Sequence, residues 1–217
     1  MLHYLYADQL HTKPRLRDGM FRDRADQFKA RLGWEVSVND TGEERDQYDP
    51  LNPLYVIWET ADGDHGGSMR FLPTLGPTMV NDIFSDLMRG RPLQNPKIWE
   101  CTRFCLARGA APQVSAALML GGAEVGMGFN LDFSLGVFDA RMIRIYRRLG
   151  WSPMILGTQG EGREAISAGL WHYSEEILKE MCHKSNIPRA VSRLWFHSSA
   201  AKQDQATNPV RRLREIA

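Results

Sequence analysis

Apolar and polar positions divide the chain into short strands and amphipathic helices. Stretches rich in β-branched and aromatic residues predict strands at Leu54–Thr60, Ser68–Leu72 and Ile98–Leu106. Apolar side chains at helical spacing predict helices at Gly19–Arg31 and Ala140–Leu149. Weaker patterns place further strands at His3–Tyr6, Leu131–Phe138 and Trp151–Leu156, and further helices at Met79–Met88, Gln113–Asn130 and Ser174–His183. Strands that alternate with helices predict an α/β fold in which a twisted sheet is covered on both faces.

Turn signals and the end of these patterns define the domain. Asp62-Gly63 predicts a tight turn between the second and third strands, so the sheet is mixed rather than all parallel. We expect one domain over residues 1–190, followed by a weakly ordered, basic tail over residues 191–217.

The strand predicted at Ile98–Leu106 carries charge in an apolar setting. Its flanks predict burial on both faces at the middle of the sheet, yet it contains Glu100 and Arg103. A buried charge destabilises a protein strongly unless it is paired, so each side chain needs a counter-ion or a chemical role. Strict alternation along a strand puts the two on opposite faces, and a β-bulge would change which of them lines a cleft.

Charged residues elsewhere supply possible partners for this strand. Arg24 lies on an amphipathic helix, Arg70 lies on a strand, and the loop Asn39–Asp49 provides Asp46 and Asp49. We expect these residues to form one ionic cluster with Glu100 and Arg103. The cluster could either fasten the loop to the sheet or belong to an active site.

Composition excludes several classes of protein. The 217 residues carry 27 Lys and Arg against 26 Asp and Glu, so the overall charge predicts no nucleic-acid partner. Three cysteines without regular spacing argue against a disulfide framework and favour a reducing compartment. The chain shows no membrane-spanning run, signal-peptide pattern, metal-ligand spacing among its histidines or phosphate-binding glycine loop. We therefore expect a cytoplasmic protein without a metal or a permanently bound cofactor.

The helix predicted at Ala140–Leu149 has one apolar and one basic side. Its basic residues, with no acidic residue among them, are Arg141, Arg144, Arg147 and Arg148. A solvated helix face explains this pattern, and so does a docking surface for an acidic partner.

Six motifs, in order and at matching spacing, resemble those of a known family. They are Phe21-Arg22-Asp23-Arg24, Arg31-Leu32-Gly33-Trp34-Glu35-Val36, Asp46-Gln47-Tyr48-Asp49, Met69-Arg70-Phe71-Leu72-Pro73-Thr74, Gly76-Pro77-Thr78-Met79 and Trp99-Glu100-Cys101-Thr102-Arg103-Phe104, with Phe28, Tyr55 and Phe84 between them. This pattern covers about residues 20–157. It resembles the acyl-homoserine lactone synthases, the LuxI-type autoinducer synthases.

The resemblance implies both a fold and a reaction. The fold would be α/β (α+β) and similar to that of the GNAT-type N-acyltransferases, with a mixed, twisted central sheet splayed into a V-shaped cleft. In the reaction, the amine of S-adenosylmethionine attacks an acyl thioester on acyl carrier protein. The methionine carboxylate then closes onto its own γ-carbon and expels methylthioadenosine, which leaves an N-acyl-homoserine lactone.

The resemblance also implies roles for individual residues. Glu100, desolvated in a strand, would take the proton of the amine, with Arg103 and Arg70 beside it in the catalytic site. The residues expected to bind S-adenosylmethionine, or to tie an N-terminal lid of about residues 1–50 to the sheet, are Arg24, Phe28, Trp34, Asp46, Asp49 and Phe84. A sulfonium and an adenine both favour aromatic faces, which suits Phe28 and Trp34.

The acyl chain and its carrier need two further surfaces. The candidates for an apolar acyl pocket, each of which could instead be ordinary core, are Leu118, Met119, Leu135, Gly136, Phe138 and Met142. Some family members have a threonine that bonds a 3-oxo group near Gly136; glycine lacks the hydroxyl and leaves space, which favours an unsubstituted or 3-hydroxy chain of medium to long length. Acyl carrier proteins are acidic, and Arg144 and Arg148 match the family's basic docking positions.

Two other functions remain open at this stage. The first is an N-acyltransferase of the same fold that uses acyl-coenzyme A or another amine. The second is a protein that binds acyl groups or carriers without catalysis. Oligomeric state does not follow from the sequence.

Overall fold

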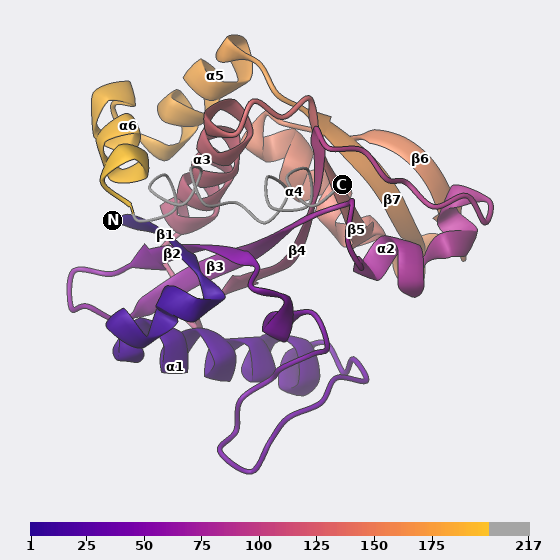
Figure 1. Ribbon diagram of the computed structural model, residues 1–217, viewed down its shortest axis with the longest axis horizontal. Helices are drawn as coiled ribbons and strands as arrows, with labels where there is room; N and C mark the ends of the chain where they lie inside the picture. Colours follow the sequence, from indigo (N-terminus) through magenta and orange to yellow (C-terminus); the bar gives the residue numbers. More distant parts are fainter. Residues whose placement is uncertain (200–217) are drawn as a thin grey trace, which may run out of the picture.

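The computed structural model describes residues 1–199, which form a seven-stranded sheet with helices on both faces (Figure 1). The strands are β1 (Leu2–Tyr6), β2 (Leu54–Glu59), β3 (His65–Pro73), β4 (Ile98–Leu106), β5 (Phe133–Asp139), β6 (Met154–Gln159) and β7 (Ile166–His172). The helices are α1 (Pro14–Arg24), α2 (Met79–Asp82), α3 (Gln113–Gly128), α4 (Ala140–Leu149), α5 (Glu175–Ser185) and α6 (Arg189–Ser198). A π-helical turn at Ala25–Arg31 continues α1.

The sheet is divided into two halves that diverge from a short common seam. Its strand order is β1-β2-β3-β4-β5-β7-β6, and β4 and β5 are the one parallel pair in this sheet. They pair only where Ile98–Glu100 faces Phe133–Leu135. Beyond that seam β4 stays paired with β3, while β5 pairs with β7 along its whole length. The two strands therefore separate, which confirms the expected mixed, splayed sheet.

Helices cover the two faces unequally. In Figure 1, α1 lies on one side of the β1–β4 half, and α3 lies on the opposite side with α5 and α6 beside it. A small apolar cluster that includes Phe21 and Ile57 packs α1 against the sheet. The main core lies between the other face of the sheet and α3, because α3 is apolar on nearly every side.

Two predicted elements have the observed boundaries, whereas others are displaced or broken. The strand Ile98–Leu106 and the helix Ala140–Leu149 occur as predicted. The first helix begins earlier than predicted, with Pro14 in its first turn, a position where the missing N–H of proline is not needed. The expected helix Met79–Met88 is broken into α2 and a 3-10 turn at Ser85–Met88.

The prediction of a weakly ordered tail from residue 191 is wrong for its first part. Residues Arg189–Ser198 form α6, which starts after Pro188 and buries Phe196 to 2% exposure. The Phe196 ring lies on Gly128 of α3, where an added Cβ would be 2.2 Å from the ring, so helix packing holds this segment. Residues 200–217 of the predicted tail lie outside the described residues.

Strand β7 was not predicted, although it lies between β5 and the edge strand β6 in the second half. Its sequence, Ile166–His172, includes Gly169 and lacks a long β-branched run. It pairs antiparallel with both β5 and β6, so its neighbours rather than its own propensity decide its conformation. Among residues 1–199, no helix has the length and apolar character needed to cross a bilayer.

Candidate active site

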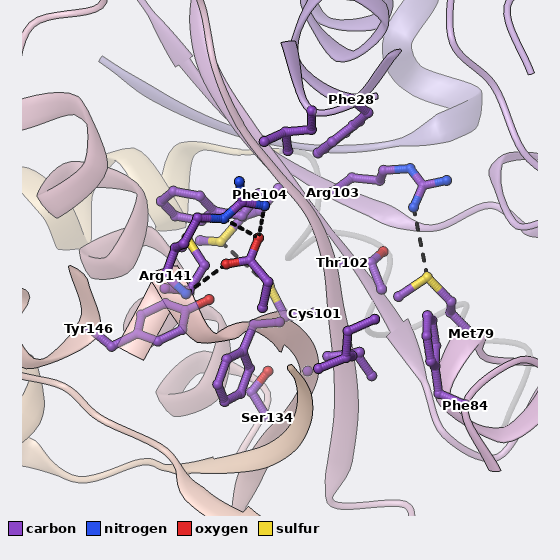
Figure 2. Close-up of a pocket in the computed structure, with 18 of the residues that line it drawn as sticks. Phe28, Met79, Phe84, Cys101, Thr102, Arg103, Phe104, Ser134, Arg141 and Tyr146 are labelled. Carbon is purple, nitrogen blue, oxygen red and sulfur yellow. Dashed lines mark hydrogen bonds and ion pairs between the residues drawn. The ribbon is translucent and has the colours of Figure 1, made fainter. Parts of the chain in front are cut away.

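The gap between β4 and β5 contains a cavity of about 860 Å³ whose lining residues come from both faces of the sheet; Figure 2 shows several of them. On the face of α1 and α2 the lining residues include Phe28, Trp34, Met79, Ile83, Phe84 and Arg103. On the face of α3 and α4 they include Met69, Phe71, Met119, Gly122, Met142 and Tyr146. A smaller, polar hollow of about 290 Å³ shares Met79, Ile83 and Arg103 with it. Two compounds that enter from opposite faces can therefore meet inside the sheet.

A buried ionic cluster borders the cavity on the face of α1. Arg24 donates to both carboxylate oxygens of Asp49 at 3.0 Å and to Glu44 at 2.5 Å. Arg70 donates to both oxygens of Asp46, at 2.5 and 2.8 Å, and to Asp49 at 2.8 Å. Such bidentate pairs fix the positions of both partners, which ties the loop before β2 to the sheet.

Arg103 completes the cluster and balances its charge. Its guanidinium lies 3.0 Å from Glu44 and 2.8 Å from Asp46. Three guanidinium groups thus face three carboxylates. Burial alone would raise the pKa of Asp46 and of Asp49, but the neighbouring arginines outweigh burial and lower both pKa values. Asp46 and Asp49 therefore stay ionised and hold the arginines in place.

Glu44 is the member of this cluster that sequence reasoning missed. It is fully buried and bridges Arg24 to Arg103. Its place in a loop rich in acidic residues concealed it, because Glu43 beside it is only partly buried and pairs with Arg45 instead, and only the fold separates the two. The sequence predicts Glu100 as the third carboxylate of the cluster, but Glu100 accepts hydrogen bonds from two backbone N–H groups instead, and Glu44 takes that place beside the arginines.

A bulge in β4 decides which side chains share the site. Pairing between β3 and β4 shifts by one residue between the pairs Arg70–Thr102 and Ser68–Cys105. At the bulge Arg103 has φ of 54°, an uncommon value for a residue with a side chain. Because of this extra residue, Arg103 reaches the same ionic cluster as Arg70, although strict alternation from Glu100 would have turned it away.

Glu100 lies next to the cavity without lining it. It is 1% exposed, and the N–H groups of Met79 and Val80 at the start of α2 donate to its two oxygens at 3.0 and 2.6 Å. Burial raises its pKa to about 7, although these two hydrogen bonds act in the opposite direction. Its chain neighbour Cys101 and its bonding partner Met79 do line the cavity. The carboxyl group therefore borders residues that line the cavity, but it does not line the cavity itself.

Two aromatic rings form the wall of the cavity near the N-terminal segment. Phe28 and Trp34 stack with ring centroids 5.2 Å apart and planes 7° from parallel. The Arg103 guanidinium lies 5.4 Å from the Phe28 centroid, and Figure 2 labels both of these residues. Phe28 sits in the π-helical turn, and Trp34 is 42% exposed. Phe84 lies on the opposite wall beside Met79. This side of the cavity suits a cationic, aromatic ligand.

The other side of the cavity is a mostly apolar tunnel. Four of the predicted acyl-pocket residues line it: Met119, Gly136, Phe138 and Met142. Leu118 and Leu135 do not, because Leu118 points into the core under α3 and Leu135 packs in a separate cluster with Val80 and Ile98. Placing these two in the acyl pocket is therefore wrong for this structure.

Aromatic residues of the tunnel were missed because two of them come from β7 or the residue after it. Tyr146, Trp171 and Phe138 contact one another edge to face at centroid distances of 4.9 to 5.4 Å. Tyr173 and Trp151 line the cavity further along. These rings also correct the expectation that Gly136 leaves space. A Cβ at Gly136 would lie 3.0 Å from the Trp171 ring, so the ring already fills that side.

Helix α4 carries its basic residues on the surface beside the tunnel. Arg141, Arg144, Arg147 and Arg148 are all exposed. Arg141 lines the cavity and pairs with Asp139, whose side chain also caps α4 (Figure 2). The other three arginines form no ion pair with any residue in the described range 1–199, so their charges are available to a partner. Within the same range no group of side chains could hold a metal ion.

Comparison with known proteins connects this geometry to a family. The sequence model described as autoinducer synthase matches residues 8–181. An acyl-homoserine-lactone synthase of Rhizobium etli is 34% identical over 201 residues, which is 89% of this chain and 93% of that protein. These matches cover the ionic cluster, the stacked rings and the tunnel together.

Solved structures share the fold at lower sequence identity. The structure described as a CoA-dependent acyl-homoserine lactone synthase, BjaI, with SAM and isopentyl-CoA superposes with a TM-score of 0.78 at 22% identity, and covers 87% of this chain and 90% of that one. An acyl-CoA N-acyltransferase from Pseudomonas aeruginosa superposes with a TM-score of 0.53 at 13% identity, covering 78% and 98%. The sheet is therefore GNAT-like. Family match and fold agree: the chain belongs to the autoinducer synthases and is an acyltransferase, an acyl-homoserine-lactone synthase.

Proposed function

We propose that the protein transfers an acyl group from acyl carrier protein to the amine of S-adenosylmethionine, and then closes the homoserine lactone ring to make a quorum-sensing autoinducer. The observation that carries this proposal is the cavity through the sheet, which joins an aromatic, polar chamber to an apolar tunnel. One chamber matches the adenosyl substrate and the other matches an acyl chain. The reacting atoms meet between them.

S-adenosylmethionine binds on the face of α1 and α2. The sulfonium and the adenine are attracted to the faces of Phe28 and Trp34, while the polar hollow near Arg103 receives the amino-acid part. Arg24, Asp46, Asp49 and Arg70 hold the walls of this chamber in place through the ionic cluster. Phe84 closes the chamber from the opposite wall.

Glu100 is the proposed base for the first step. A free α-amine has a pKa of about 8, so it must lose a proton before it attacks. With its own pKa raised to about 7, the Glu100 carboxylate is matched to that task. Because its side chain does not line the cavity itself, we infer that it acts through a bridging water. Arg103 and Arg70 hold the neighbouring carboxylates of the ionic cluster in place while the proton is transferred to Glu100.

The remaining steps need positioning more than additional groups. The amine forms a C–N bond, the C–S bond of the thioester breaks, and backbone N–H groups on the unpaired edge of β4 stabilise the oxyanion. The carboxylate oxygen of the same substrate then attacks its γ-carbon and expels methylthioadenosine. Since the sulfonium is a good leaving group, orientation in the chamber accounts for most of this step.

The acyl donor is proposed to be acyl carrier protein, which docks on α4. Arg144 and Arg148 are exposed and lack an acidic partner within residues 1–199, so an acidic carrier can contact them directly. The similar structure BjaI is described as CoA-dependent, which makes acyl-coenzyme A the alternative donor. Three free cysteines are compatible with the cytoplasmic location that we propose.

The test is to supply the purified protein with S-adenosylmethionine and either octanoyl-acyl carrier protein or octanoyl-coenzyme A. We expect equal amounts of methylthioadenosine and octanoyl-homoserine lactone, measured by mass spectrometry, with a higher kcat/KM for the carrier thioester. A higher kcat/KM for the coenzyme A thioester would show that coenzyme A rather than acyl carrier protein carries the acyl group, and it would leave the rest of the proposed reaction unchanged. If neither thioester gave methylthioadenosine, the proposed reaction would be refuted.

A further inference from the structure

Gly122 is the residue of α3 that leaves the tunnel wall without a side chain. It lines the cavity from the middle of the helix, where glycine is less favourable than alanine. We propose that Gly122, together with Met69 opposite it, sets the length of acyl chain that the enzyme accepts. This inference rests on the proposed function, since it assigns a role to residues of the same tunnel.

The other glycines of α3 have a different explanation. A Cβ at Gly121 would lie 2.6 Å from Val56, a Cβ at Gly126 would lie 2.1 Å from Tyr173, and a Cβ at Gly128 would lie 2.2 Å from Phe196. At each of these three positions the backbone of α3 packs directly against a core side chain or an aromatic ring, which leaves no space for a Cβ atom. At none of them could a side chain enter without moving a neighbour out of the core.

Gly122 instead faces side chains of the tunnel itself. A Cβ there would lie 3.1 Å from the terminal methyl of Met69 and 3.6 Å from Phe71, and both residues line the cavity. The methionine end is flexible, so a methyl group can be accommodated by a small shift of Met69 into the tunnel. A larger side chain would occupy the tunnel directly. The helix therefore tolerates substitution at residue 122, and the tunnel does not.

The remaining tunnel wall cannot compensate for a narrower passage at residue 122. Beyond it, Trp171 is held by edge-to-face contacts with Tyr146 and by its indole N–H, which donates to the Trp151 carbonyl oxygen at 3.3 Å. Tyr173 is seated against the backbone of α3 at Gly126. One methylene more or less in an apolar pocket changes the preference between two substrates by roughly 10- to 200-fold. The space left by the missing side chain at Gly122 is therefore enough to decide between acyl chains of different length.

The experiment compares G122A and G122V with the wild type on a mixture of octanoyl, decanoyl, dodecanoyl and tetradecanoyl thioesters at equal concentration. We expect G122V to shift the ratio of lactones toward shorter chains by at least about tenfold, and G122A to shift it less in the same direction. Replacing Met69 by alanine in the G122V background should restore part of the wild-type ratio. The KM for S-adenosylmethionine should stay constant, because Gly122 lies on the opposite face from Phe28.

The matched control is L118V, which changes a buried residue of the same helix outside the cavity and should leave the ratio unchanged. A folded G122V with the wild-type ratio would overturn the inference; if G122V does not fold, an unchanged ratio in G122A would overturn it. Fatty acids of the same lengths, followed by intrinsic tryptophan fluorescence, to which Trp151 and Trp171 beside the tunnel contribute, test the length preference without turnover. Absence of lactone from the wild type, with the binding preference still shifted in G122A, would refute the proposed function and retain this inference.

Discussion

Replacing Glu100 by glutamine separates the stability role of this side chain from its chemical role. The carboxyl group is 1% exposed, and burial raises its pKa from 4.5 to about 7. A pKa that is higher in the folded state means that the folded protein holds this proton more tightly than the unfolded chain. The stability that comes from the neutral form is therefore complete below pH 4.5 and is lost as pH rises through about 7.

The size of this effect follows from the two pKa values. At about 1.4 kcal/mol for each pH unit, the interval between 4.5 and about 7 corresponds to about 3 kcal/mol of unfolding free energy. A glutamine cannot ionise, so this loss is absent from the variant. Its amide also replaces one of the two oxygens that accept from Met79 and Val80, which costs about 1–3 kcal/mol at every pH. Only the pH-dependent part reports on the buried charge.

The assay is urea unfolding of the wild type and E100Q at several pH values between 4.5 and 8. The stability of E100Q relative to the wild type should rise by about 3 kcal/mol over this range, while kcat/KM for lactone synthesis falls by about 100-fold or more. In the wild type, kcat/KM should decrease as pH falls below about 7, because the base becomes protonated. If the difference in unfolding free energy between E100Q and the wild type stayed constant across the pH range, the raised pKa of Glu100 would be refuted. A fully active E100Q would refute Glu100 as the base.

Four further substitutions test other parts of the site. Arg24→Ala leaves two buried carboxylates short of a partner and should lower the free energy of unfolding by about 3–5 kcal/mol in urea; a loss below about 1 kcal/mol would contradict the buried cluster. Arg144→Glu with Arg148→Glu should raise the KM for the acyl carrier at nearly unchanged kcat, and an unaltered KM and salt response would exclude α4 as the docking surface. Trp34→Ala should raise the KM for S-adenosylmethionine about tenfold with little change in Tm, since the ring is 42% exposed; a wild-type KM would remove it from the binding site. Gly136→Thr should lower the unfolding free energy by about 1–3 kcal/mol, because its side chain meets the neighbouring indole, and full stability by calorimetry would show that the ring can move.

The local pattern of the chain was sufficient for the elements that lead into the site. Continuous apolar character identified Ile98–Leu106 as a central strand, and alternation of apolar and basic positions identified Ala140–Leu149 as an amphipathic helix. Charges in apolar surroundings identified Arg24 and Arg70 as members of a cluster, and in the structure both pair with the carboxylate of Asp49. These predictions succeeded because burial and helical or strand periodicity are properties of short segments.

Pairing and packing decided the rest of the site. The bulge that turns Arg103 into the ionic cluster depends on the register between β3 and β4, and the choice of Glu44 over its neighbour depends on how the loop lies on the sheet. Strand β7, which contributes Trp171 to the tunnel, pairs with both β5 and β6, and these long-range pairings are not visible in its own sequence. The periodicity of α3 marks Leu118 and Met119 alike as buried, yet only Met119 faces the cavity.

The sequence by itself determined that this protein has a buried, charged strand, a basic helix and the motifs of an acyl-homoserine-lactone synthase. Only the tertiary structure decided that β4 and β5 separate after a three-residue seam, and which buried side chains line the space between them. The physical reason is that a residue's apolar character records whether it is removed from water, whereas the surface it meets depends on strand register and helix rotation across the whole fold.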